Sequence, residues 1–158
     1  MSYDFNANEI LKMAEQIERN GYQFYKSAAE NVANSQEREF LLKLAEMERH
    51  HEKLFASIRS ELSEQEGEAT VFDPENETGL YIRALADTRV FFEKKIDISS
   101  MEEILQAAIV AEKDSIIFYL GMKNTVPEHL GRGKIDIIIE EEMSHITLLS
   151  NALLALKK

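Results

Sequence analysis

Two copies of one short motif are the clearest chemical signal in this 158-residue sequence. Glu48 is followed three residues later by His51, and Glu142 is followed in the same way by His145. Residues three apart share one face of a helix, so each pair can offer a carboxylate and an imidazole to one metal ion. One such pair is common on helices that bind no metal. Two copies favour a metal site over the alternative, a buried polar network without metal.

Both motifs belong to an internal repeat. A shift of 94 residues superposes the two halves of the chain without a gap. The residues that coincide include Leu11 and Leu105, Ala14 and Ala108, Glu18 and Glu112, Phe24 and Phe118, Tyr25 and Tyr119, Leu44 and Ile138, Glu46 and Glu140, Glu48 and Glu142, and His51 and His145. Rare and charged residues would not coincide at a chance offset. The repeat therefore predicts two helical hairpins of common design about a pseudo-twofold axis.

Glu18 and Glu112 would bring two further carboxylates to that axis. Like Glu48 and Glu142, they interrupt stripes of apolar residues spaced three and four apart, the pattern of a buried helix face. Buried carboxylates are costly, and four at one level repel one another. Two divalent cations would offset both effects, as in the dinuclear carboxylate sites of helical bundles. The predicted metal ligands are Glu18, Glu48, His51, Glu112, Glu142 and His145.

The donor types favour iron or manganese over structural zinc. The chain has no cysteine, which excludes zinc ribbons, iron–sulfur clusters and thiol catalysis in these residues. A carboxylate-rich set suits two iron ions, with manganese or zinc as alternatives. Tyr25 and Tyr119 are either hydrogen-bond donors to ligand carboxylates or ordinary core tyrosines. Four other titratable residues are predicted to lie on the surface: His50, His129, Glu140 and Glu141.

Four long helices must position these residues. Helical periodicity runs over residues 6–32, 35–62, 100–123 and 127–156. The candidate N-caps are Asn6, Asn34 or Ser35, Ser100 and Thr125. Two glycines, Gly131 and Gly133, leave open a later start of the fourth helix near Lys134.

A long connection over residues 63–99 allows the second and third helices to run parallel. The fold class that follows is all-α, a ferritin-like four-helix bundle with one long crossover. We treat residues 1–158 as a single domain. Residues 80–95 are too apolar for a bare linker and are expected to form one or two short helices. The segment Leu80–Phe92 is expected to lie at the interface of a homodimer or larger assembly.

Composition narrows the functional classes. The net charge of −11 argues against a nucleic-acid-binding protein, which would normally have a basic face. No apolar run is long enough for a transmembrane helix, and the first residues lack the features of a secretory signal. We therefore expect a cytoplasmic protein that does not associate with membranes.

Four stretches resemble the rubrerythrin branch of the ferritin-like di-iron proteins: EQIERNGYQFY, LAEMERHHEKLF, AEKDSIIFY and EEEMSHITLL. Together they cover the centre of all four predicted helices. The resemblance implies that the six predicted ligands bind iron. It also implies peroxide reduction, or the oxidation of ferrous iron by dioxygen that relatives perform.

Two departures from rubrerythrin matter. Rubrerythrin has a further glutamate one turn after the helix-three ligand, where this chain has Ser115, with Gly21 at the repeat position. This difference argues against the ligand exchange that accompanies redox change in rubrerythrin. The cysteine-ligated rubredoxin domain is also missing from these residues. The resemblance is therefore to short stand-alone forms that receive electrons from a separate protein or small reductant.

The expected function is that of a non-haem di-iron oxidoreductase, with peroxide or dioxygen oxidising a di-ferrous pair. Glu48 and Glu142 are expected to bridge the two ions, and Glu18 and Glu112 to bind one ion each. One alternative is a metal-binding or iron-handling protein without catalytic turnover. Another is an interaction module in which the metals are structural.

Overall fold

The computed structural model describes residues 7–66, 80, 84, 99–126 and 128–157. Within this part of the chain, four long α-helices are present: α1 (Ala7–Asn31), α2 (Ser35–Glu66), α4 (Met101–Met122) and α5 (Arg132–Leu156). Two single-turn 3-10 helices, Lys123–Thr125 and Glu128–Leu130, connect α4 to α5. The described residues include no strand, and the all-α prediction is confirmed.

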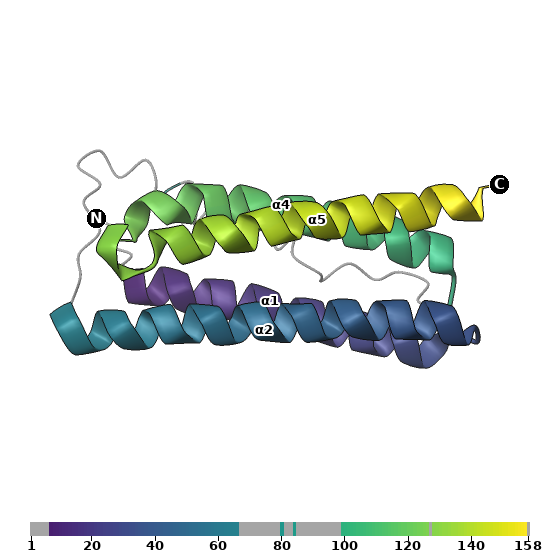
Figure 1. The fold of residues 1–158 in the computed structure, drawn as a ribbon, viewed down its shortest axis with the longest axis horizontal. Coiled ribbons are helices and arrows are strands. Elements are labelled where there is room, and N and C mark those ends of the chain that lie inside the picture. Colours follow the sequence, from purple (N-terminus) through teal and green to yellow (C-terminus); the bar gives the residue numbers. More distant parts are fainter. Residues whose placement is uncertain (1–6, 67–79, 81–83, 85–98, 127, 158) are drawn as a thin grey trace.

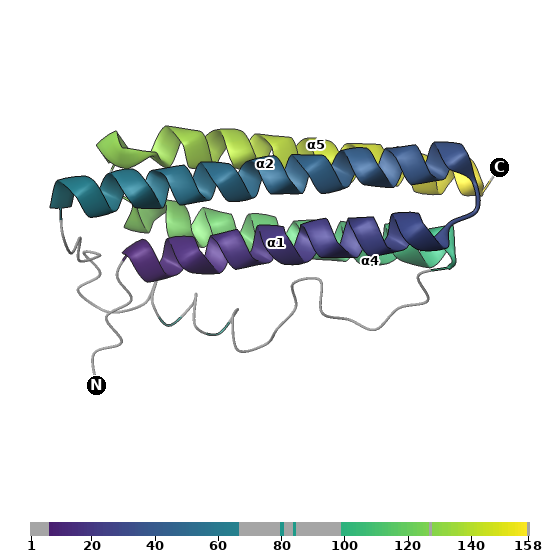
Figure 2. The same cartoon turned by 90° about the horizontal axis from the view of Figure 1, so that it is seen from below.

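The helices form two antiparallel hairpins that pack side by side (Figures 1 and 2). Helix α1 pairs with α2 and α4 pairs with α5, while α1 lies next to α4 and α2 next to α5. Helices α2 and α4 run in the same direction (Figure 1), as one long crossover between them requires. The predicted four-helix bundle is therefore confirmed. The predicted short helices and interface at Leu80–Phe92 fall outside the described residues, apart from Leu80 and Ala84.

Side-chain caps fix the start of two helices. The Asn34 side chain accepts hydrogen bonds from the backbone N–H groups of Gln36 (2.9 Å) and Glu37 (3.0 Å), so Asn34 rather than Ser35 caps α2. The Ser100 hydroxyl accepts from the backbone N–H of Glu103 at 3.4 Å, as predicted for α4. The predicted cap Asn6 lies outside the described residues.

Helix α5 begins later than the cap at Thr125 predicts. The chain first makes the two 3-10 turns and then reaches Gly131, whose φ of 137° favours glycine. A Cβ at this position would lie 2.9 Å from carbon atoms of Ile58, so the close approach of α2 also requires glycine. The Arg132 guanidinium donates to the carbonyl of Val126 at 3.0 Å and holds the turn in place. Tertiary contact, rather than a side-chain cap, sets the start of this helix.

Two apolar clusters fill the bundle and leave a polar layer between them. One cluster includes Phe55 and Tyr119, whose ring centroids are 5.0 Å apart. The other includes Tyr25, Leu41 and Leu149. Burial of each large apolar side chain contributes about 1.5–3 kcal/mol, so these clusters stabilise a bundle whose middle layer is unfavourable by itself. None of the described helices is long and apolar enough to span a membrane.

Candidate metal centre

All six predicted ligands meet in the polar layer at the middle of the bundle. Each long helix supplies at least one of them, because the repeat places equivalent residues at equivalent heights. Glu48 is 2% exposed and the other five are fully buried. The layer consists of Glu18, Glu48, His51, Glu112, Glu142 and His145.

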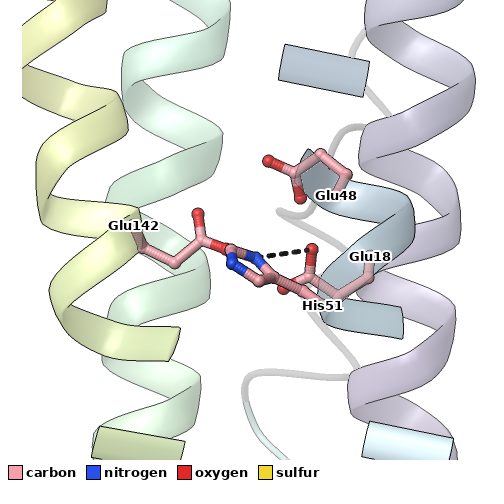
Figure 3. Close-up of side chains that lie close together, drawn as sticks. All are labelled: Glu18, Glu48, His51 and Glu142. Carbon is pink, nitrogen blue, oxygen red and sulfur yellow. Dashed lines mark hydrogen bonds and ion pairs between the residues drawn. The ribbon is translucent and has the colours of Figure 1, made fainter. Parts of the chain in front are cut away.

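The six residues form two overlapping groups. In the first, ligand atoms of Glu18, Glu48, His51 and Glu142 lie within 4.8 Å of one another; in the second, Glu112 and His145 join Glu48 and Glu142 within the same distance. Figure 3 shows the first group, with Glu142 reaching from α5 towards His51 and Glu18. Glu48 and Glu142 belong to both groups. They therefore occupy the position that bridging carboxylates need.

The histidines face the shared carboxylates through their Nδ1 atoms. Nδ1 of His51 lies 2.8 Å from Oε1 of Glu142 and 3.6 Å from Oε2 of Glu18. Nδ1 of His145 lies 3.4 Å from carboxylate oxygens of both Glu48 and Glu142, and 3.5 Å from Oε1 of Glu112. The two rings stack with their centroids 5.7 Å apart. His51 is thus near Glu18 and one shared carboxylate, whereas His145 is near Glu112 and both shared carboxylates.

Two tyrosines cross-link the hairpins at this level. The Tyr25 hydroxyl on α1 donates to Oε1 of Glu112 on α4 at 2.7 Å. The Tyr119 hydroxyl on α4 donates to Oε1 of Glu18 on α1 at 2.6 Å. Burial, together with the nearby carboxylates, raises the pKa of both phenols well above the usual value, so they remain protonated donors. Each tyrosine therefore orients a carboxylate of the other repeat. Of the two roles considered from the sequence, both tyrosines act as hydrogen-bond donors to candidate ligands.

Without a metal, the layer retains protons. Burial raises the pKa of Glu48 well above its usual value, and the charges of Glu112 and Glu142 act in the same direction. The pKa of Glu112 rises to about 8, first because of burial and then because of Glu142. Burial lowers the pKa of His51, but its contacts with Glu142 and Glu18 outweigh that effect and raise it to about 11.

A cation pair fits the atoms that protein groups leave unsatisfied. Among the described residues, one carboxylate oxygen on each of Glu18, Glu48, Glu112 and Glu142 is buried without a hydrogen-bond partner, as are both ring nitrogens of His145. A buried polar atom without a partner costs about 1–3 kcal/mol. Coordination would satisfy these atoms together, and a donor set rich in oxygen suits iron or manganese.

Glu141 is partly exposed, as expected of a surface residue, but its carboxylate also contacts a candidate ligand. Its side chain is 41% exposed, yet Oε2 lies 2.5 Å from Nε2 of His51. The spacing of residues along one helix could not predict this contact, because Glu141 extends from the flank of α5 across to a side chain of α2. Its position directly before Glu142 was the available signal. The other three residues placed on the surface are exposed: His50, His129 and Glu140.

Small residues occupy the positions one turn after Glu18 and Glu112. Gly21 is buried, and Ser115 is 2% exposed. The Ser115 hydroxyl donates to the carbonyl of Ala111 at 2.9 Å, within its own helix. Neither position supplies a carboxylate to the layer.

Comparison with known proteins agrees with this geometry. The sequence model of the rubrerythrin family matches residues 8–98, which include Glu18, Glu48 and His51. A solved structure from Thermotoga maritima, provisionally described as a ferritin-like diiron-carboxylate protein, superposes with a TM-score of 0.70. The match covers 97% of each chain at 22% identity and shows that the fold is shared. No curated protein sequence gives a significant match.

Proposed function

This chain belongs to the rubrerythrin family, and on that premise we propose that it is a di-iron oxidoreductase that reacts with peroxide or dioxygen. Family membership and the buried cluster of carboxylates and histidines together support iron binding. The observation that carries the proposal is the pair of overlapping ligand groups that share Glu48 and Glu142. A site for one ion would need only one of these groups.

The proposed ligand set places one iron in each group. Glu18 and His51 would bind the first iron, and Glu112 and His145 the second, with Glu48 and Glu142 in contact with both. Four carboxylates would balance two divalent cations, which removes the mutual repulsion that raises the pKa of Glu48. The iron pair, when bound, would supply two electrons to an oxygen-containing oxidant.

The surrounding residues define how such a site would be used. The apolar clusters on both sides keep bulk water away from the layer. Tyr25 and Tyr119 hold the two terminal carboxylates in place through their hydroxyl groups. Gly21 and Ser115 are small residues one turn after Glu18 and Glu112, and this small size would favour access of a small oxidant. Reduction of one hydrogen peroxide to two waters takes up two electrons and two protons.

The electrons would come from a separate donor. The 158 residues contain no cysteine, so they hold no cysteine-ligated iron that could pass electrons to the centre. Ferrous iron supplied as substrate would serve the same purpose in a ferroxidase reaction. A donor protein or a small reductant therefore completes the proposed cycle.

Rapid mixing of the reduced, iron-loaded protein with one equivalent of peroxide tests this function. We expect the iron absorption to change within seconds and two ferrous ions to be oxidised for each peroxide consumed. Air-saturated buffer provides the corresponding test for dioxygen. If a protein with a full iron complement reacts with neither oxidant, the chain binds iron without turnover and the oxidoreductase proposal fails.

A further inference from the structure

A second candidate site lies outside the bundle core, between the outer faces of α1 and α2. It is a hollow of about 400 Å³ whose lining includes Arg19, Tyr22, Gln23, Arg49, Glu52 and Lys53. Small-molecule sites usually enclose about 300–1,000 Å³. The hollow is thus large enough for an organic ligand and larger than a single small ion requires.

The lining is cationic although the chain is strongly acidic. Three basic side chains and one acidic side chain line the hollow, whereas the whole chain has a net charge of −11. Arg19 is held by Glu52, with guanidinium nitrogens 2.8 and 3.1 Å from one carboxylate oxygen. No ion pair is seen for Lys53 among the described residues. The local excess of positive charge is suited to an anion.

The Arg49 guanidinium is held by an aromatic ring but has no hydrogen bond to a carboxylate among the described residues. It lies over the Tyr22 ring, 4.2 Å from the ring centroid, and this cation–π contact fixes its plane. Its nearest described carboxylate is that of Glu46, at 3.9 Å, which is too long for a hydrogen bond. The N–H groups at the edge of the guanidinium are therefore available to a ligand in the hollow.

The internal repeat shows that the bundle does not need this lining. The positions equivalent to Tyr22, Arg49 and Lys53 in the second hairpin are Ile116, Met143 and Thr147. The candidate metal ligands are the same in both hairpins, but two of the three basic residues of the hollow, Arg49 and Lys53, are present only in the first. Packing of a helical hairpin alone thus does not account for these two residues.

The hollow is next to the candidate metal centre. Arg19, Arg49 and Glu52 directly follow Glu18, Glu48 and His51 in the sequence, so the same helical turns carry both sets of residues. A residue one position further along a helix is rotated by about 100° around its axis. The two sites therefore lie on different faces of the same two helices.

We propose that this hollow binds the phosphate group of a small organic molecule. The Arg49 guanidinium and the Lys53 ammonium match a doubly charged tetrahedral anion better than a single carboxylate, because a guanidinium group binds phosphate oxygens in a bidentate manner. Arg19 adds positive charge only, since its guanidinium already donates to Glu52 and Gln16. The remaining volume of the hollow suits the organic part of a phosphate ester. This inference does not depend on the proposed redox function.

Calorimetric titration with adenosine 5′-diphosphate and, separately, with inorganic phosphate tests the proposal. The protein is used as purified, with its metal content measured before and after titration. We expect Arg49→Met, which installs the residue of the second hairpin, to weaken diphosphate binding by about tenfold or more, since a charge-assisted contact is lost. Lys53→Thr should weaken it in the same direction.

Lys113→Met is the matched control, because Lys113 is the repeat counterpart of Arg19 and follows Glu112 directly. It removes one positive charge next to the metal layer but outside the hollow, and it should leave the affinity unchanged. Tighter binding of the diphosphate than of phosphate would identify an ester ligand, and equal binding would identify the free anion. Absence of binding to the wild-type protein, or an affinity that Arg49→Met does not change, would overturn the proposal.

Discussion

The two halves of the candidate metal centre have the same ligands but different surroundings. On one side, Nε2 of His51 contacts the Glu141 carboxylate at 2.5 Å. On the other side, Nε2 of His145 is buried and has no hydrogen-bond partner among the described residues. The repeat counterpart of Glu141 is Met47, which has no carboxylate to offer. The repeat thus preserves the six candidate ligands but not the contact that a histidine ligand makes with a neighbouring carboxylate.

This difference predicts two unequal metal sites. A carboxylate that accepts a hydrogen bond from a ligating histidine fixes the ring orientation and increases the basicity of the other nitrogen. Of the two histidines, only His51 has such a partner within the part of the chain that the structure describes. We therefore expect the His51 side to bind its ion more tightly and to fill first when metal is limiting.

The largest loss of metal binding is expected from replacing the two carboxylates that both halves of the site share. Glu48→Ala combined with Glu142→Ala removes the carboxylates that both groups share, so binding of both ions should be lost. Metal analysis after dialysis measures the number of ions per chain. Glu46→Ala combined with Glu140→Ala is the matched control, because these exposed glutamates also coincide in the repeat. A double shared-site variant that keeps two ions would refute the ligand assignment.

The metal-free protein should become less stable as the pH rises from 6 to 9. The folded pKa values of His51 (about 11), His145 (about 10) and Glu112 (about 8) all exceed their usual values. For His145 as for His51, burial lowers the value, and contacts with carboxylates, here Glu112 and Glu142, outweigh it. The folded state therefore binds more protons than the unfolded state across this range.

The stability that these protons provide is fully present below the unfolded pKa values and decreases as the pH approaches the folded ones. Urea denaturation at pH 6 and pH 9 measures the difference in the free energy of unfolding. Metal-loaded protein should show the opposite trend at fixed metal concentration, since coordination requires deprotonated ligands. Higher stability of the metal-free protein at pH 9 than at pH 6 would show that the layer does not retain protons.

Replacing Glu141 should make the two sites more alike. Glu141→Met installs the residue of the first repeat and should weaken the tighter ion by about 10–100-fold, the usual effect of losing such a histidine partner. The reciprocal change, Met47→Glu, should strengthen the weaker ion. Metal-competition titration resolves the two affinities. Identical affinities before and after Glu141→Met would show that this contact does not distinguish the sites.

The smallest expected effect is the loss of stability when either of the two tyrosines, Tyr25 or Tyr119, is replaced. Burial raises the pKa of Glu18, but its interactions with Glu48, His51 and Tyr119 outweigh that effect and lower it, so Tyr119 donates to a charged group. Glu112 has a pKa of about 8 and is mostly neutral at pH 7. Tyr119→Phe should therefore destabilise the metal-free protein by about 1.5–3 kcal/mol, and Tyr25→Phe by about 0.5–1.5 kcal/mol. Equal losses in urea denaturation would contradict this assignment of charge.

The sequence was sufficient for what depends on local spacing. The repeat and the three-and-four spacing predicted the four helices and placed all six candidate ligands on buried faces. The start of α5 was not predictable in this way, because it depends on the positive φ of Gly131 and on the close approach of Ile58 from α2. The hydrogen bond of Tyr25 to Glu112 and the contact of Glu141 with His51 could not be predicted from the sequence either, since each depends on how one helix faces another.

Diffraction at the iron absorption edge, from crystals of the iron-loaded protein, tests the central claim most directly. We expect two anomalous peaks per chain, about 3.5–4 Å apart, one beside each histidine and both near Glu48 and Glu142. At limiting iron, the peak beside His51 should be the stronger. A single peak, or none among the six residues, would contradict the claim that this layer holds a metal pair.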